Sequence, residues 1–134
     1  MIHLDTSFLV DLLRETSRGK LGPASAFLVE IENEQLAASV FVQCELYAGA
    51  ELSRRPKAER NKVDELSMGV TIVYPGPTIP ITYARLFATL ERAGQRIGNM
   101  DLLIAASAVT AEAPLLTRNV DEFSRIPELE LLTY

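Results

Sequence analysis

The chain has 134 residues, of which 48% are hydrophobic and 23% are charged, with a formal net charge of −5. This length and composition are ordinary for one soluble globular domain, expected to span residues 1–134 and to bury its own core. A single cysteine excludes an internal disulfide, no apolar run approaches a membrane span, and no secretory signal opens the chain. We therefore expect a cytoplasmic protein with no membrane partner.

The first half of the chain alternates short apolar stretches with helical patterns. Thr6 and Ser7 are good caps for a first helix, and Pro23 suits the start of a second. Turn residues that include Gly19 and Gly22 separate these helices. In chain order, the pattern predicts a strand at 1–5, a helix at 6–14, a helix at 23–33, a strand at 35–38 and a helix at 39–52.

The second half repeats this alternation. Val70 to Tyr74 is β-branched and aromatic, which favours a strand, and prolines with Gly76 mark the loop that follows. In chain order, the pattern predicts a charged helix at 54–68, a strand at 70–74, a helix at 81–94, a helix from 99 that Pro114 ends, a strand at 115–117, a helical turn at 119–123 and a strand at 129–133. Short strands separated by helices predict an α/β/α sandwich with a mostly parallel central sheet of four to five strands.

Three carboxylates, far apart in the chain, each adjoin an apolar segment. Asp5 follows the first strand, Glu45 lies inside an apolar helix, and Asp101 opens another. Carboxylates are rarely buried unless they are paired or bind a metal, and ligands of parallel sheets bind at the carboxyl ends of the strands. The pattern indicates a site for a hard divalent cation. Taken singly, Asp5 could instead cap a helix, Glu45 could be a surface residue, and Asp101 could stabilise a helix dipole.

The chemistry that such a site supports is hydrolysis of a phosphodiester. Magnesium takes oxygen ligands and is bound through one or two carboxylates, and a metal can activate water and stabilise charge on phosphate. The sequence has no zinc-type spacing and no phosphate-binding glycine loop. His3 is the only histidine and lies in the first strand, where a core or edge role is expected.

A basic segment qualifies the acidic net charge, which by itself argues against nucleic acid. Five cations lie close together against two acids: Arg54, Arg55, Lys57, Arg60 and Lys62. They indicate either a solvated helix face with intrahelical pairs or an arm that contacts phosphates beside a metal-filled cleft.

Four sequence blocks resemble one family of proteins. They are Ile2–Val10, the segment around Glu45 and Leu46, Gly98–Ala106, and Leu116–Asn119 with Phe123. In order and spacing they resemble PIN-domain proteins, and in particular the VapC toxins of bacterial VapBC toxin–antitoxin pairs, over nearly the whole chain. The resemblance implies a magnesium- or manganese-dependent endoribonuclease with a PIN fold and an RNA substrate of the transfer or ribosomal class. It also implies a homodimer and a cognate VapB antitoxin whose tail occupies the active-site groove.

The resemblance also assigns roles by position. Asp5 and Asp101 would be the principal metal ligands, and Glu45 would ligate directly or through water and help orient the attacking water. The fourth family position is usually acidic, but this chain carries Asn119 there. The number of metal ions, one or two, therefore stays open. The other residues so implicated are Ser7, Thr117 and Asp121 as supports, with Glu122 as a second nearby acid, and Arg54, Arg55 and Lys57 as RNA contacts.

Two other functions stay open at this point. The altered fourth position leaves room for a non-toxin PIN protein that acts in RNA processing or binding. A receiver-like phosphoacceptor domain would need adjacent acids after the first strand and a lysine after a late strand. Asp5 is followed by Thr6, and Thr117 by Arg118, so the receiver is the remoter alternative.

Overall fold

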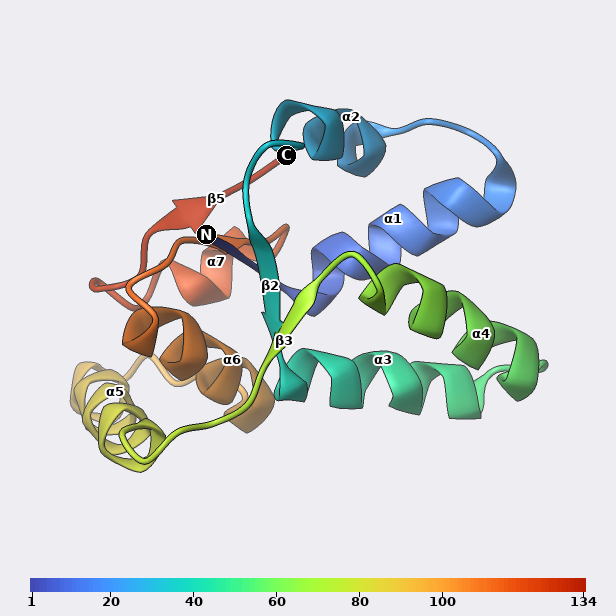
Figure 1. Ribbon diagram of the computed structural model, residues 1–134. Helices are drawn as coiled ribbons and strands as arrows, with labels where there is room; N and C mark the ends of the chain where they lie inside the picture. Colours follow the sequence, from blue (N-terminus) through green and yellow to red (C-terminus); the bar gives the residue numbers. More distant parts are fainter.

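A five-stranded parallel sheet forms the centre of the computed structural model, which describes all of residues 1–134 (Figure 1). Its strands lie in the order β3-β2-β1-β4-β5, and every neighbouring pair is parallel. The strands are β1 (Ile2–Leu4), β2 (Leu36–Ser39), β3 (Thr71–Val73), β4 (Leu115–Leu116) and β5 (Leu131–Leu132). The predicted α/β fold with a parallel sheet is confirmed.

Seven helices flank the sheet, and six of them pack against one another as three pairs. They are α1 (Thr6–Arg18), α2 (Pro23–Glu30), α3 (Val40–Leu52), α4 (Pro56–Ser67), α5 (Ile79–Ala93), α6 (Asn99–Thr110) and α7 (Val120–Phe123). Helix α1 packs on α2, α3 on α4, and α5 on α6, so that α3 and α4 lie on one side of β2 in Figure 1 and α5 and α6 on the other. None of these helices combines the length and apolarity that crossing a membrane would require.

Two helix ends differ from the prediction. Helix α1 continues to Arg18 rather than Arg14 and ends where Gly19 adopts a left-handed conformation with φ 62°. Residues without a β-carbon enter this region at little cost, so the glycine, not the polar run before it, ends the helix. Helix α2 ends at Glu30 instead of Asn33. The other elements lie within a few residues of their predicted bounds.

The core gathers around β1 and α6. All three residues of β1 are buried, including His3, whose pKa is lowered by burial and then by the nearby N-terminal amine. This places His3 in the core, as expected from the sequence. Helix α6 is buried on most of its surface, and its alanines let it approach the sheet closely.

This topology brings distant segments to one edge of the sheet. Because β1, β2 and β4 are parallel neighbours, their carboxyl ends point the same way. Asp5 follows β1, helix α3 follows β2, and Thr117 follows β4. The candidate site lies at this edge.

Candidate active site

Asp5 is buried at the junction of β1 and α1, with only 3% of its surface exposed. It occupies the N-cap position of α1, but its side chain makes no capping hydrogen bond, so the interpretation of Asp5 as a helix cap is wrong. Instead, its Oδ2 accepts hydrogen bonds from the Ser7 and Thr117 hydroxyls, each at 2.7 Å. Its Oδ1 has no hydrogen bond from the protein and is free to bind a ligand.

The turn after β4 is tied to these supports. The backbone N–H of Arg118 donates to Ser7 Oγ at 3.0 Å, and that of Asn119 donates to Thr117 Oγ1 at 2.9 Å. Each supporting hydroxyl therefore accepts one hydrogen bond and donates another to Asp5. Ser7 and Thr117 hold the Asp5 carboxylate in one orientation, as their sequence positions predict.

Glu45 reaches the same edge from α3. The Thr6 hydroxyl donates to its Oε1 at 2.6 Å, which links the start of α1 to α3. Glu45 is half-buried, so it is not an ordinary surface residue of its helix. Its Oε2 has no protein partner.

Asp101 lies in the first turn of α6 and is the most perturbed of the cleft carboxyl groups. Burial, then interaction with the neighbouring Glu122 carboxyl, then the negative charges of Asp5, Glu122 and Glu45 raise the pKa of Asp101 to about 7. Like charges that share a site raise a carboxyl pKa in this way. The electrostatics therefore place four carboxyl groups within range of one another.

The fourth of these groups is Glu122, which the sequence did not single out above its neighbour. Asp121 is exposed on α7, whereas Glu122 on the same short helix interacts with Asp101, and neither of the two lines the cleft. Asp121 stays a predicted supporting residue, and Glu122, the second acid predicted nearby, is the one that interacts with Asp101. Asn119 does line the cleft, half-buried, and its side-chain amide makes no protein hydrogen bond.

These side chains surround a polar cleft of about 360 Å³. No hydrophobic side chain lines it, and its wall consists of Asp5, Thr6, Ser7, Glu45, Asp101, Arg118 and Asn119. The predicted acidic residues Asp5, Glu45 and Asp101 are thus brought together from three segments of the chain.

The donor set suits a hard divalent cation. Carboxylate, hydroxyl and amide oxygens line the cleft, and the negative charges of Asp5, Glu122 and Glu45 add to burial in raising the pKa of Asp101. No three acidic side chains converge on one point. Magnesium keeps several waters and uses one or two carboxylates, so Asp5 and Asp101 are sufficient as direct ligands.

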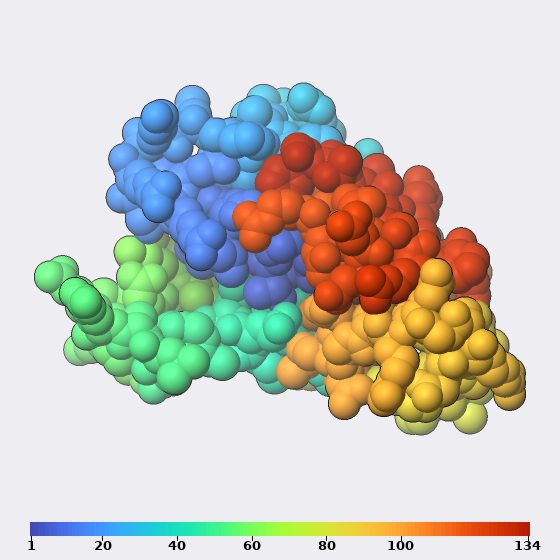
Figure 2. All heavy atoms as spheres, turned by 180° about the vertical axis from the view of Figure 1, so that it is seen from behind, coloured from blue at the N-terminus to red at the C-terminus, as the bar shows by residue number.

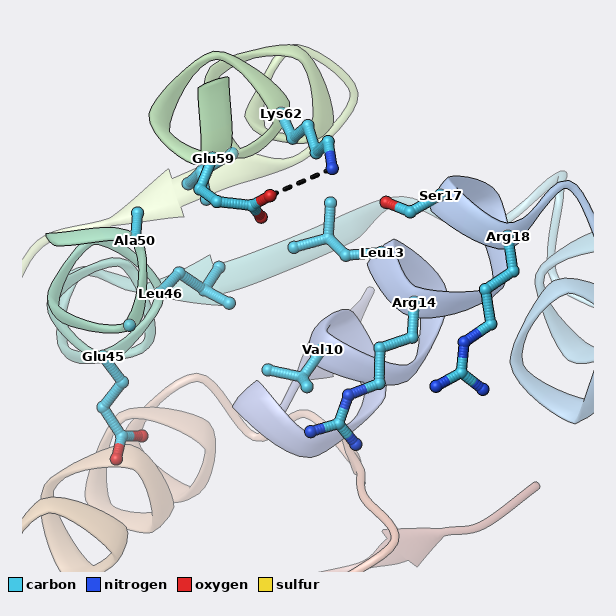
Figure 3. Close-up of a pocket in the computed structure, with 12 residues that line it drawn as sticks. Val10, Leu13, Arg14, Ser17, Arg18, Glu45, Leu46, Ala50, Glu59 and Lys62 are labelled. Atoms are coloured by element: carbon cyan, nitrogen blue, oxygen red, sulfur yellow. Dashed lines mark hydrogen bonds and ion pairs between the residues drawn. The ribbon is translucent and has the colours of Figure 1, made fainter. Parts of the chain in front are cut away.

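A second hollow of about 410 Å³ adjoins the cleft and lies between α1 and the α3–α4 pair (Figure 3). We call it the α1–α3 groove. Glu45 belongs to both hollows, and Figure 3 shows its carboxylate turned away from Glu59 and Lys62 towards α6. The groove has an apolar floor and a charged rim that includes Arg14, Arg18 and Lys62.

The predicted RNA contacts lie elsewhere. Arg54, Arg55 and Lys57 are exposed and make no ion pair, at the α3–α4 junction that projects from one end of the molecule (Figure 2). None of the three lines the acidic cleft. Two neighbouring cations are neutralised: Arg60 pairs with Glu51 at 2.9 Å, and Lys62 pairs with Glu59 at 3.0 Å.

One residue that contacts a side chain of the cleft was missed in the sequence. Asp11 has the appearance of a surface helix residue, yet its side chain is only 16% exposed and accepts hydrogen bonds from Arg118 and Tyr134. Its partners are 107 and 123 residues away in the chain, so no local pattern could reveal them.

Comparison with known proteins agrees with this fold. The PIN domain family matches residues 2–129. The curated ribonuclease VapC1 of Haemophilus influenzae is 32% identical over 127 residues, which cover 95% of this chain and 92% of that protein. Among solved structures, VapBC2 of Rickettsia felis bound to a promoter DNA fragment contains a chain with a TM-score of 0.91 and 30% identity, covering 100% of this chain and 99% of that one. The structure of VapBC-1 from nontypeable Haemophilus influenzae contains a chain with a TM-score of 0.79 and 31% identity, and the match covers 99% of this chain and 98% of that one.

Proposed function

This chain belongs to the PIN-domain family, and from that premise we propose that it is a VapC-type toxin, an endoribonuclease of a VapBC toxin–antitoxin pair. It hydrolyses RNA phosphodiester bonds. The observation that carries this proposal is the cleft in which Asp5, Glu45 and Asp101 gather at the carboxyl edge of a parallel sheet. A non-toxin PIN protein is not favoured, because similar proteins over nearly the full chain are VapC ribonucleases.

The cleft would hold magnesium or manganese through Asp5 and Asp101, with Glu45 joining directly or through water. When bound, such a cation would lower the pKa of a water molecule and stabilise charge on the phosphate. Asp5 is held for this role by the Ser7 and Thr117 hydroxyls on Oδ2, which leave Oδ1 free. Asn119 offers a carbonyl oxygen at the same cleft, next to the Asp101–Glu122 pair.

Glu45 is the group best placed to receive a proton. Thr6 fixes its Oε1 with a hydrogen bond of 2.6 Å, so Oε2 is the atom that accepts the proton from the attacking water. The oxygen of that water forms a bond to phosphorus as the bond to the leaving oxygen breaks. The hydroxyl of Thr6 thus orients a base that extends from a different helix.

The antitoxin would occupy the α1–α3 groove with its C-terminal tail and reach the cleft at Glu45, which lines both hollows. The apolar floor suits apolar side chains of such a tail, and Arg14 and Arg18 on the rim suit its acidic groups. Residues 1–134 would act as one PIN domain in the cytoplasm, assembled as a homodimer. The RNA would be of the transfer or ribosomal class.

Expression of the wild-type chain and Asp5→Ala side by side tests the function in cells. The wild type is expected to arrest growth and to create new RNA ends at a restricted set of positions, detected by sequencing of RNA ends. The Asp5→Ala variant should do neither, because a cation would lose one of its two principal ligands.

The matched control is Ala substitution of Asp64, an exposed acid on α4 outside the cleft, which should behave like the wild type. Co-expression of a small neighbouring reading frame should rescue growth. Arrest with the same new RNA ends from the Asp5→Ala variant, or no new ends from the wild type, would refute the proposed function.

A further inference from the structure

Arg118 is the only cation that lines the acidic cleft. Asp5, Glu45 and Asp101 would repel a polyanionic substrate that enters the cleft. A cationic side chain at this point would offset part of that repulsion. Arg118 is well exposed there, with 57% of its side chain open to solvent. The position is therefore reachable by a ligand in the cleft.

The arginine is fixed at both ends. Its backbone N–H donates to Ser7 Oγ at 3.0 Å, and Ser7 in turn holds Asp5. Its side-chain Nη1 donates to both oxygens of Asp11, at 2.6 and 2.7 Å. The backbone of Arg118 is thus linked through Ser7 to the Asp5 carboxylate of the cleft, while Asp11 holds the guanidinium.

Asp11 is itself held from the opposite side. The Tyr134 hydroxyl donates to its Oδ2 at 2.6 Å, and the Tyr134 ring packs edge-to-face on Phe8 with centroids 5.0 Å apart. Burial, then the hydrogen bond to Asp11, raise the pKa of Tyr134, so its hydroxyl keeps the proton that it donates. Arg14 also lies 3.9 Å from Asp11, so one carboxylate faces two guanidinium groups and a net positive charge remains.

The remaining donors of Arg118 have no partner. Nη1 makes both contacts to Asp11, while Nε and Nη2 make no hydrogen bond within the protein. A planar guanidinium with two free donors matches the oxygens of a phosphate in a bidentate contact. An exposed ion pair that served stability alone would contribute little, so the ordered contacts point to a positioned side chain.

We propose that Arg118 contacts a backbone phosphate of the RNA in the cleft through Nε and Nη2, and that Asp11 and Tyr134 are positioning residues that aim it. This inference rests on the proposed RNA-cleaving function. It identifies which cation at the site recognises the substrate, a role that the exposed cluster at Arg54, Arg55 and Lys57 was expected to serve.

The test measures binding of a single-stranded RNA to Arg118→Gln and Arg118→Lys across a range of salt, in an Asp101→Asn background that prevents cleavage. For single strands, each phosphate contact contributes about 0.7 to the slope of log affinity against log salt. Arg118→Gln is expected to reduce the slope by about that amount. Arg118→Lys should keep the slope, because it keeps the charge, but bind about tenfold more weakly because it loses the bidentate geometry.

Cleavage kinetics with intact Asp101 provide the second readout. Arg118→Gln and Asp11→Asn should raise KM more than they lower kcat, with binding of Mn²⁺ alone unchanged. The matched control is Arg85→Gln, which removes a surface arginine of helix α5 that pairs with Glu128 and does not line the cleft, and which should leave slope and KM unchanged.

If Arg118→Gln lost thermal stability but kept the wild-type salt slope and KM, the inference would be overturned. The Arg118–Asp11 ion pair would then have only a structural role. Because the wild type must cleave RNA in the same assay, that result would leave the proposed function standing. Absence of cleavage by the wild type would instead refute the function itself.

Discussion

Two aspartates at the cleft have opposite surroundings. Asp5 accepts two hydroxyl hydrogen bonds, whereas Asp101 has no hydroxyl partner and lies near the Glu122, Asp5 and Glu45 carboxyl groups. Hydrogen bonds to a carboxylate favour its charged form, and neighbouring negative charge disfavours it. Asp101 is therefore the cleft residue whose state depends most on a bound cation.

Glu122 should control the ionisation of Asp101. In metal-free protein, Asp101 should titrate with a pKa of about 7, and Glu122→Gln should lower that pKa because it removes the largest contribution after burial. The exposed neighbour offers a matched control, since Asp121→Asn should leave the titration unchanged. Carboxyl-carbon NMR of each variant measures the pKa, and an effect of Asp121→Asn equal to that of Glu122→Gln would contradict the placement of these residues.

The same shift predicts how stability depends on pH. The pKa of Asp101 is raised by folding from 3.8 to about 7, so the folded state holds the proton more tightly than the unfolded state. The resulting stabilisation is fully present below pH 3.8 and is lost as the pH rises through about 7. This part of the pH dependence should disappear in Asp101→Asn.

Residues that follow a local pattern were predictable, and residues defined by tertiary contacts were not. Asp5, Glu45 and Asp101 each adjoin an apolar segment, which marks them in the sequence. Glu122 could not be preferred to Asp121, because only the direction of α7 separates them. Asp11 carries no local signal in the sequence, because its proposed function depends on contacts with Arg118 and Tyr134, which lie far away in the chain.

At the scale of elements, helix α2 begins without a capping side chain of its own. Gly22 occupies its N-cap position, and the carboxylate of Glu15 on α1 accepts hydrogen bonds from the N–H groups of Gly22, Ala24 and Ser25 at 2.8, 3.1 and 2.9 Å. The first N–H groups of a helix have no partner within it, so this carboxylate satisfies them from a neighbouring element. A β-carbon on Gly22 would lie 2.6 Å from the Glu15 carboxyl carbon, so any larger residue there would push this carboxylate out of its capping position.

Glu15→Gln should therefore lower the melting temperature. Burial acts to raise the pKa of Glu15, but hydrogen bonds from Ser25, Ala24 and Gly22 outweigh it and lower the pKa overall. The stabilisation is present above the ordinary glutamate pKa and is lost as the pH falls through the lowered folded value. The difference in melting temperature from the wild type should thus be larger at pH 7 than in acid.

Glu32→Gln provides the control, because Glu32 is exposed just after α2 and its side chain makes no hydrogen bond. It should melt like the wild type at both pH values. Equal melting temperatures for Glu15→Gln and the wild type at pH 7 would show that α2 does not depend on this cap.

Helix ends show why element boundaries were less predictable than the elements. The polar residues after Arg14 suggest a turn, yet they continue α1, and Glu15 in this added turn caps α2. The order of strands and helices, by contrast, follows from apolar spacing and turn residues along the chain. Contacts between elements determine where each helix ends, and these contacts cannot be read from the sequence of one element alone.

At the scale of the whole molecule, the parallel sheet creates the site. Segments near residues 5, 45 and 101 meet because β1, β2 and β4 end at one edge and α6 packs across it. The predicted fold class was sufficient to expect this meeting. It was not sufficient to foresee the α1–α3 groove, which depends on how α1 and the α3–α4 pair diverge (Figure 3).

The most direct test of the central claim is cleavage of RNA by the purified protein as divalent cations are removed and restored. The wild type should lose activity with a chelator and regain it with magnesium or manganese. Asp5→Asn, with an unchanged circular dichroism spectrum, should lose more than about a hundredfold in rate, since even loss of an outer partner of a metal site costs 10–100-fold. Cleavage that persists without any divalent cation, or an Asp5→Asn variant as active as the wild type, would contradict the assignment of this cleft as the active site.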